Sequence, residues 1–327
     1  MSRPCSAPFA LVLACQATAE NGLVDDALEA KSAEPSGTSS TTGEAPAPEQ
    51  PRDDADARDV GVPADPCDSV DLLFVVDNSQ SMADEQAHLV AGFPGFIEGI
   101  GSILGEDTDY HVGVITTDDN RFNGIGCRKL GALVTRTGGE SSSDAACGPY
   151  VEGFGYMTPS DALDQAFDCA AKVGVEGDGF ERPMEAITAA LGAARGTPQS
   201  VGNLALCNAG FLRDGALLVV TLITDEDDDG DSPGDPAAWY DAVVAAKGGD
   251  AERVVVLSLV GHPAPNDCIA GQWDGLDGAE IAAQIIEFTG MFEHGYVGDV
   301  CSDDYGAFFT ASVAGVADAC HVVVGVD

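Results

Sequence analysis

The sequence predicts an α/β fold, a three-layer sandwich in which a mainly parallel central sheet is flanked by helices. Three largely apolar runs carry this prediction, because a strand that is buried on both faces shows no polar alternation. These runs cover residues 72–76, 216–224 and 253–260. Segments with helical patterns separate them, and strands that alternate with helices are typical of a parallel sheet.

The other predicted elements follow in chain order. A helical region over residues 83–104 contains Gly92, Pro94 and Gly95, so it should be kinked or divided into two short helices. Further strands are expected at residues 110–116, 131–136 and 321–324. Further helices are expected at residues 160–172, 182–194, 237–247, 279–289 and 302–319, the third of which should start at Asp235 or Pro236.

Residues 1–15 predict an export signal, because Arg3, a short apolar run and Ala14 precede Cys15. The apolar run is far too short to span a membrane. The letters V-L-A-C resemble a bacterial lipobox, in which the cysteine is lipidated. A lipid at Cys15 would then be the only membrane contact. Ordinary secretory cleavage near Ala19, or no export at all, are the alternatives.

Residues 16–66 are predicted to form a disordered tether, and residues 67–327 a single domain. The tether is acidic and rich in alanine, proline, serine and threonine. It holds too few large apolar residues to offset the loss of chain entropy on folding. Behind a lipidated cysteine, such a tether would hold the domain away from a membrane.

The formal net charge of −41 lies mostly in residues 67–327. Such a surface repels nucleic acid and anionic lipid, so we expect no nucleic-acid partner. It favours divalent cations and positively charged partners. The ten cysteines include no C-x-x-C pair, which disfavours a zinc ribbon or a thioredoxin-like motif and favours an exported protein. We expect disulfide-stapled loop insertions, and proximity in sequence favours Cys127 with Cys147 and Cys268 with Cys301.

Two of the predicted strands run into an aspartate, which indicates a metal site. The first strand leads into the D-x-S-x-S run of Asp77, Ser79 and Ser81, and the strand at residues 216–224 is followed by Asp225. Ligands of open α/β sheets collect at the carboxyl ends of strands. Carboxylates and hydroxyls suit Mg²⁺, Mn²⁺ or Ca²⁺. The alternative is that the aspartate or a serine caps the next helix.

The order of these motifs resembles the von Willebrand factor type A domain. The features that carry the resemblance are a strand, D-x-S-x-S, a helix, a glycine-led loop before a later helix, and a strand that ends in T-D. It covers residues 67–327 and implies a metal-ion-dependent adhesion site that binds a protein partner, with Mg²⁺ first and Ca²⁺ or Mn²⁺ as alternatives. It also implies that Ser79 and Ser81 bind the metal directly and that Asp77 and Asp225 act through water.

The second loop departs from the family pattern, G-x-T-x-x-x-x-A followed by isoleucine or leucine. The matching stretch starts at Gly179, and Glu181 takes the place of the ligand threonine. With Asp77, Glu181 and Asp225 ionised, a divalent cation would leave a net charge of about −1, which weakens capture of a partner's carboxylate. Glu181 could also fill the open metal position itself.

Two alternatives to this role of Glu181 remain open. Glu181 could instead pair with Arg182 or Arg213, or cap the helix that begins at Pro183. Thr158 is a weaker candidate for the threonine ligand, because it precedes a different helix.

A second acidic run, D-E-D-D-D-G at residues 225–230, resembles the start of a calcium loop. Pro236 stands where an EF-hand needs its glutamate, so an EF-hand is not expected. The run could still hold a second calcium, although a solvated acidic loop is more common. The candidate ligands are Asp227, Asp228, Asp229 and Asp231.

We therefore expect an exported, metal-dependent protein-binding domain and not an enzyme, located in the cell envelope as an outer-membrane lipoprotein or at the cell surface. The alternative is a structural or assembly component of the envelope whose metal only stabilises loops. A metal-dependent phosphohydrolase with Asp77 as nucleophile is less favoured, because Ser79 stands where phosphotransferases of the haloacid dehalogenase type have a second aspartate.

Overall fold

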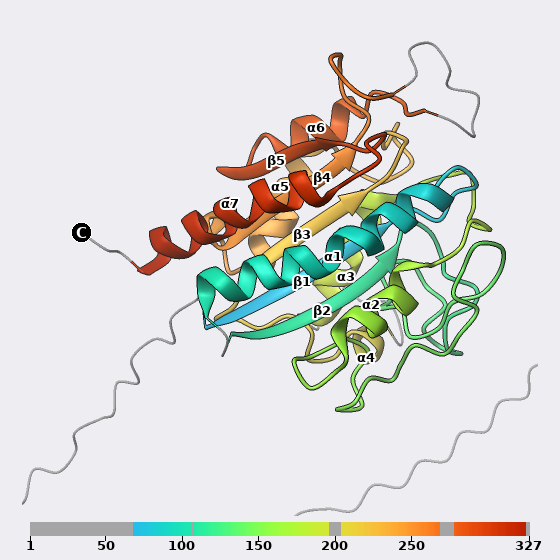
Figure 1. Cartoon of the computed structure of the whole chain (residues 1–327), viewed down its shortest axis with the longest axis horizontal. Coiled ribbons are helices and arrows are strands. Elements are labelled where there is room, and N and C mark those ends of the chain that lie inside the picture. The colour runs from blue at the N-terminus through green and yellow to red at the C-terminus, as the bar shows by residue number, and fades with distance from the viewer. Residues whose placement is uncertain (1–67, 106–107, 196–203, 269–277, 325–327) are drawn as a thin grey trace, which may run out of the picture. The chain divides into compact units, whose positions relative to one another are not determined.

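The computed structural model describes residues 68–105, 108–195, 204–268 and 278–324 (Figure 1). The predicted export signal and tether lie outside these described residues. In the described part, no helix is both long and apolar enough to cross a membrane.

Five parallel strands form one central sheet in the order β2-β1-β3-β4-β5. The strands are β1 (Ser69–Val76), β2 (Asp109–Thr116), β3 (Leu217–Ile223), β4 (Val254–Val260) and β5 (His294–Asp299). Every residue of β3 and β4 is buried, as is all of β1 after its first residue. Burial on both faces explains why these strands lack polar alternation in the sequence.

Helices cover both faces of the sheet, which confirms the predicted sandwich (Figure 1). Side chains of β1 alternate between two cores: Phe74 packs in one and Leu73 in the other. The first core lies under α1 (Ala83–Leu104), α2 (Leu163–Ala171) and α7 (Gly306–Val324). The second lies under α3 (Pro183–Ala194), α5 (Pro236–Ala246) and α6 (Ala283–Thr289). A one-turn helix α4 (Leu204–Cys207) and a 3₁₀ turn η1 (Ala251–Arg253) complete the described elements.

Helix α1 is continuous, although it contains Pro94. The predicted alternative of two short helices is therefore wrong. Its glycines allow α7 to approach closely. A Cβ atom at Gly92 would lie 3.0 Å from the ring of Phe309, and one at Gly99 would lie 2.8 Å from Val313. Gly92 and Gly99 therefore serve helix packing, and none of the glycines breaks the helix. Helix α5 starts as predicted, since Asp235 accepts a hydrogen bond from the backbone N–H of Ala238.

The strand predicted at residues 131–136 is wrong, because side chains bind much of its backbone. The N–H of Leu133 donates to Asn208 Oδ1 (3.0 Å), and the N–H of Thr135 donates to Asn123 Oδ1 (3.1 Å). Val134 alone reaches β2, where its N–H donates to the carbonyl of Val114. The segment is therefore a loop that lies along β2.

The predicted last strand is also wrong, because residues 321–324 continue α7. The fifth strand is instead β5, whose sequence H-G-Y-V-G-D holds no apolar run. Its glycines are needed for packing: a Cβ at Gly295 would collide with the carbonyl of Thr289, and one at Gly298 with the ring of Phe308.

Three disulfides are formed in the described part of the chain: Cys127–Cys207 and Cys147–Cys169 join a loop to a helix, and Cys268–Cys301 joins two loops. The pairing of Cys268 with Cys301 is confirmed, and the pairing of Cys127 with Cys147 is wrong. Packing of α2 brings Cys169 to the loop of Cys147, where the Ser143 hydroxyl donates to the carbonyl of Cys169 (2.7 Å). Cys320 is disulfide-bonded as well. Disulfides of this number indicate an oxidising compartment, and hence an exported or extracellular protein.

Candidate metal-binding site

The aspartates that follow β1 and β3 meet at the carboxyl edge of the sheet, because these strands are neighbours. The backbone N–H of Asp77 donates to the carbonyl of Ile223 (3.0 Å), which extends the pairing beyond β1. The hydroxyl of Thr224 donates to Asp77 Oδ2 (2.6 Å). This bond fixes the Asp77 carboxylate beside the backbone of Asp225. Parallel pairing therefore brings the first and third predicted loops together.

The serines of the D-x-S-x-S run lie close to each other and to Asp77. The N–H of Ser79 donates to Asp77 Oδ1 (2.7 Å), and the hydroxyl oxygens of Ser79 and Ser81 are 3.3 Å apart. Both serines are more than nine-tenths buried. The residue that precedes α1 is Met82 and not one of these three, and the side chain of Met82 makes no capping hydrogen bond. The simple capping alternative therefore does not account for these residues.

Glu181 lies at the same edge of the sheet and is 2% exposed. Its Oε2 accepts a hydrogen bond from the hydroxyl of Thr117, which follows β2. Its other oxygen, Oε1, is buried and has no hydrogen-bond partner. Burial and the nearby Asp77 carboxylate raise the pKa of Glu181 to about 10.

The structural roles considered for Glu181 do not occur. Arg182 forms an ion pair with Glu185 (3.3 Å), and Arg213 forms one with Asp71 (2.8 Å). The start of α3 is capped by side chains of the acidic loop, described below.

The alternative ligand Thr158 is engaged elsewhere. Its hydroxyl and its N–H both donate to Asp161 Oδ2, at 3.2 and 2.8 Å, ahead of α2. The bonds of Thr158 therefore order the turn before α2.

Asp225 is the least satisfied of the site's carboxylates. It is 1% exposed, and both of its oxygens are buried without a hydrogen-bond partner. Burial and the charge of Asp77 raise the pKa of Asp225 to about 8; the Ser81 hydroxyl, which is near but not in hydrogen-bonding geometry, offsets part of this rise. Burial also raises the pKa of Asp77, and burial with the charge of Asp77 raises that of Glu226 to about 7.

The unpartnered oxygens fit a hard divalent cation, because a buried acceptor without a donor is otherwise costly. Ligand atoms of acidic, cysteine and histidine side chains gather closely at one place only in the described residues. There, three such atoms lie within 4.8 Å of one another, and they belong to Cys268, Asp299 and Cys301. The carboxylates of Asp77, Glu181 and Asp225 are therefore more widely spaced. A cation among them would need the serine hydroxyls, or water, to complete its oxygen ligands.

The acidic run after Asp225 caps two helices. Asp227 accepts hydrogen bonds from the N–H groups of Gln284 (3.0 Å) and Ile285 (3.3 Å) in the first turn of α6. Asp228 accepts one from the N–H of Met184 (3.2 Å) in the first turn of α3. Both carboxylates are buried, so the expectation of a solvated acidic loop is wrong for them. Asp229 and Asp231 are exposed.

Replacing Asp227 with alanine is expected to lower the free energy of unfolding by about 1 kcal/mol, because two N–H groups of α6 lose their acceptor. The measurement is the midpoint of urea denaturation in the presence of a chelator. The control is Asp229→Ala in the same loop, whose side chain is exposed and should change stability by less than about 0.5 kcal/mol. Equal stabilities of the two variants would contradict the capping role.

Residues 230–234 read G-D-S-P-G and match the letters of a hydrolase nucleophile elbow, G-x-S-x-G. That elbow requires the serine to stand on a tight turn directly between a strand and a helix. Here Ser232 is buried in a longer loop after β3, and its hydroxyl accepts a hydrogen bond from the N–H of Glu185 (2.8 Å). Ser232 therefore helps to cap α3.

A polar cavity of about 430 Å³ adjoins the site, and the sequence analysis did not foresee it. Asn78 of the D-x-S-x-S run lines it and donates from Nδ2 to Asp118 Oδ1 (2.9 Å). The lining also includes Arg121, which forms an ion pair with Glu176. The signal that could have indicated this cavity is the polar run D-D-N-R at residues 118–121, directly after β2.

Fold and site thus define an exported α/β sandwich with an acidic oxygen-donor site at the carboxyl edge of its sheet. No protein-family model matches the chain, and neither does any curated protein. Two crystal forms of proximal thread matrix protein 1 from the mussel byssus align with it, at TM-scores of 0.37 and 0.40 and 15% and 14% sequence identity. Each alignment covers 76% of this chain and 46% of that protein, so the chain spans less than half of the mussel protein's length.

Proposed function

We propose that this domain is a metal-dependent, adhesion-type protein-binding module and not an enzyme. One observation carries the proposal: both carboxylate oxygens of Asp225 are buried without a partner, beside Ser81 and Asp77. A cation that binds such a carboxylate should stabilise the fold, because an uncompensated buried carboxylate destabilises it.

Each residue of the site has a distinct role in this proposal. Ser79 and Ser81 would hold the cation directly, and Asp77 and Asp225 would act through water, as the resemblance to the von Willebrand type A domain implies. Glu181 would add a third negative charge. The bound cation would supply an open position for an oxygen donor of the partner. Mg²⁺ is the first expectation, and Ca²⁺ or Mn²⁺ would also accept these oxygens.

Charge and location support a protein partner. The net charge of −41 disfavours nucleic acid and anionic lipid surfaces. The disulfides support an exported location, and a lipid anchor at Cys15 would place the domain in the cell envelope, as an outer-membrane lipoprotein or at the cell surface.

A structural or assembly role in the envelope is the second candidate. It is favoured by the acidic loop, because residues adjoining Asp225 cap α3 and α6. A cation bound there would stabilise two helix starts as well as its own ligands. In that case the metal would strengthen the fold without contacting a partner.

The double variant Ser79→Ala and Ser81→Ala separates the two candidates. For a binding module, we expect it to lose saturable Mg²⁺ binding in calorimetry and Mg²⁺-dependent retention of envelope proteins on the immobilised protein. Its free energy of unfolding in chelator should change by less than about 1 kcal/mol. Ser102→Ala is the control, since that exposed hydroxyl of α1 bonds only the carbonyl of Gly99.

A different result for retention would support the structural role. Retention of envelope proteins would then be equal with and without Mg²⁺, whereas stabilisation of the native protein by Mg²⁺, absent from the double variant, is expected of either candidate. A phosphohydrolase would be revived only by metal-dependent turnover of a phosphate ester that disappears in Asp77→Asn.

A further inference from the structure

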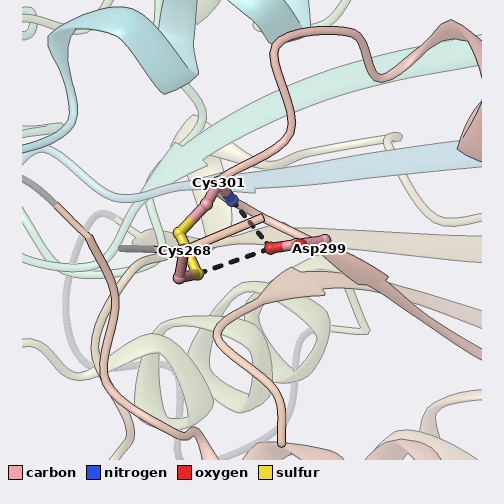
Figure 2. Close-up of side chains that lie close together, drawn as sticks. All are labelled: Cys268, Asp299 and Cys301. Carbon is pink, nitrogen blue, oxygen red and sulfur yellow. Dashed lines mark hydrogen bonds between the residues drawn. A yellow bond between two sulfur atoms is a disulfide. The ribbon is translucent and has the colours of Figure 1, made fainter. Parts of the chain in front are cut away.

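A second cluster of metal-ligating side chains lies where β4 and β5 end (Figure 2). Asp299 is the last residue of β5, and Cys301 lies two positions after it. Cys268 lies in the loop after β4. One ligand atom from each of these three residues lies within 4.8 Å of the others. Cys268 Sγ is 3.5 Å from Asp299 Oδ1. None of these residues belongs to the candidate site described above.

The Asp299 carboxylate positions both cysteines independently of their disulfide. Its Oδ1 accepts a hydrogen bond from the N–H of Cys301 (3.0 Å). Its Oδ2 accepts one from the N–H of Asp267, the residue before Cys268. Opening the sulfur–sulfur bond would therefore leave the two loops held to the same carboxylate. Each carboxylate oxygen has a second lone pair that these bonds do not use.

A fourth candidate ligand, His262 of the loop after β4, lies outside this trio and is near it on the side of Asp299. Its Nδ1 is 2.9 Å from the carbonyl oxygen of Pro263. A carbonyl only accepts hydrogen bonds, so the neutral ring carries its proton on Nδ1 and presents a lone pair at Nε2. That Nε2 is 3.9 Å from Asp299 Oδ2. A lone pair beside a carboxylate is favourable only with a proton or a metal cation between them, and metal-bound histidines commonly donate their other N–H to a backbone carbonyl.

We propose that reduction of the Cys268–Cys301 disulfide converts this cluster into a Zn²⁺ site. While the disulfide is closed, neither sulfur is a thiolate, so the strong metal ligands are absent. A dithiol reductant supplies two electrons and two protons: the sulfur–sulfur bond breaks, two thiols form, and the dithiol becomes a disulfide. Zn²⁺ then displaces both thiol protons and binds two thiolates, the Asp299 carboxylate and His262 Nε2.

This ligand set selects the metal. Two soft thiolates with an imidazole and a carboxylate suit a four-coordinate Zn²⁺, whereas Mg²⁺ and Ca²⁺ prefer oxygen alone. The other two disulfides lack such neighbours in the described part of the chain. The sulfurs of Cys147 and Cys169 face the hydroxyl of Ser143, at 3.8 and 3.5 Å. That pair therefore provides an internal control.

The test is Zn²⁺ titration of the full-length protein against a chromophoric chelator, before and after treatment with a dithiol that is then removed. Mass spectrometry of alkylated peptides verifies that Cys268 and Cys301 are reduced. We expect the reduced protein to bind one more equivalent of Zn²⁺ than the oxidised protein. The reduced double variant Cys268→Ser and Cys301→Ser should lack that equivalent, and Cys147→Ser with Cys169→Ser should keep it.

Single substitutions test the other two ligands. His262→Ala and Asp299→Asn should weaken Zn²⁺ binding by about 100-fold or more, because the loss of a direct ligand should cost at least as much as the roughly 10–100-fold cost of losing an outer-shell partner. Asp303→Asn, an exposed neighbour, should leave it unchanged. His262 is a quarter exposed, so its replacement should not disturb the fold. Unchanged affinity in His262→Ala, or equal Zn²⁺ binding by reduced wild type and the Cys268→Ser, Cys301→Ser variant, would overturn the proposal.

Discussion

Replacing Asp225 with asparagine is expected to abolish Mg²⁺ binding and, at about pH 9, to stabilise the metal-free protein. The pKa of Asp225 is about 8, so at that pH its carboxylate is ionised, buried and without a hydrogen-bond partner. Asparagine removes the charge and nearly keeps the shape. The free energy of unfolding in chelator should rise by about 1–3 kcal/mol, because a buried ionised group costs more than a neutral amide in the same place. Calorimetric titration and urea denaturation measure the two effects.

The opposite signs of these effects make the test specific to a cation site. Asp229→Asn is the matched control, because it removes an exposed carboxylate from the same loop and should change neither quantity. If Asp225→Asn destabilised the metal-free protein, the carboxylate would have a stabilising partner in the protein itself, and the proposed cation would be unnecessary.

The stability of the metal-free protein should fall as the pH rises from about 5 to about 10. The pKa of Asp225 rises from an ordinary 3.8 to about 8 in the folded state, and that of Glu181 from 4.5 to about 10. The unfolded chain therefore releases these protons at lower pH than the folded protein. Rising pH favours the unfolded state until each folded pKa is passed. Each group contributes at most about 1.4 kcal/mol per pH unit.

Saturating Mg²⁺ should flatten this decline, because the cation stabilises the ionised carboxylates. Denaturation curves over this pH range, in Mg²⁺ and in chelator, measure the difference. Glu181→Gln should flatten the decline above about pH 8 even in chelator, because Asp225 has ionised by then. The control Glu293→Gln removes an exposed carboxylate and should leave the slope unchanged. Identical slopes with and without Mg²⁺ would argue against a cation among these groups.

The sequence predicts the central strands and the edge strand β2, but it misses β5 at the other edge of the sheet. Strands β1, β3 and β4 are buried on both faces, so each appears as an apolar run. β5 lies at the edge of the sheet. Its glycines are required by close packing against Thr289 and Phe308, which no local sequence pattern reveals. The loop at residues 131–136 has the composition of a strand, but its backbone is bound by the side chains of Asn123, 12 positions from Thr135, and Asn208, 75 positions from Leu133.

The same distinction applies to the candidate site. Asp77 and Asp225 could be placed together because both follow buried parallel strands. The bond of Glu181 to Thr117 joins residues 64 positions apart, and only the folded loops bring them together. The disulfide Cys127–Cys207 spans 80 positions, so proximity in sequence could not find it.

The carboxylates of residues 225–228 have different partners, and this limits how the loop can change in evolution. By composition alone this run is a simple acidic repeat, whose aspartates would be interchangeable. Yet Asp225 has two unpartnered oxygens, Asp227 serves one helix and Asp228 another. Inserting one uncharged residue within this run would keep every charge but shift the carboxylates relative to their partners. Related proteins should therefore differ at Asp229 far more often than in the length of the loop that precedes it.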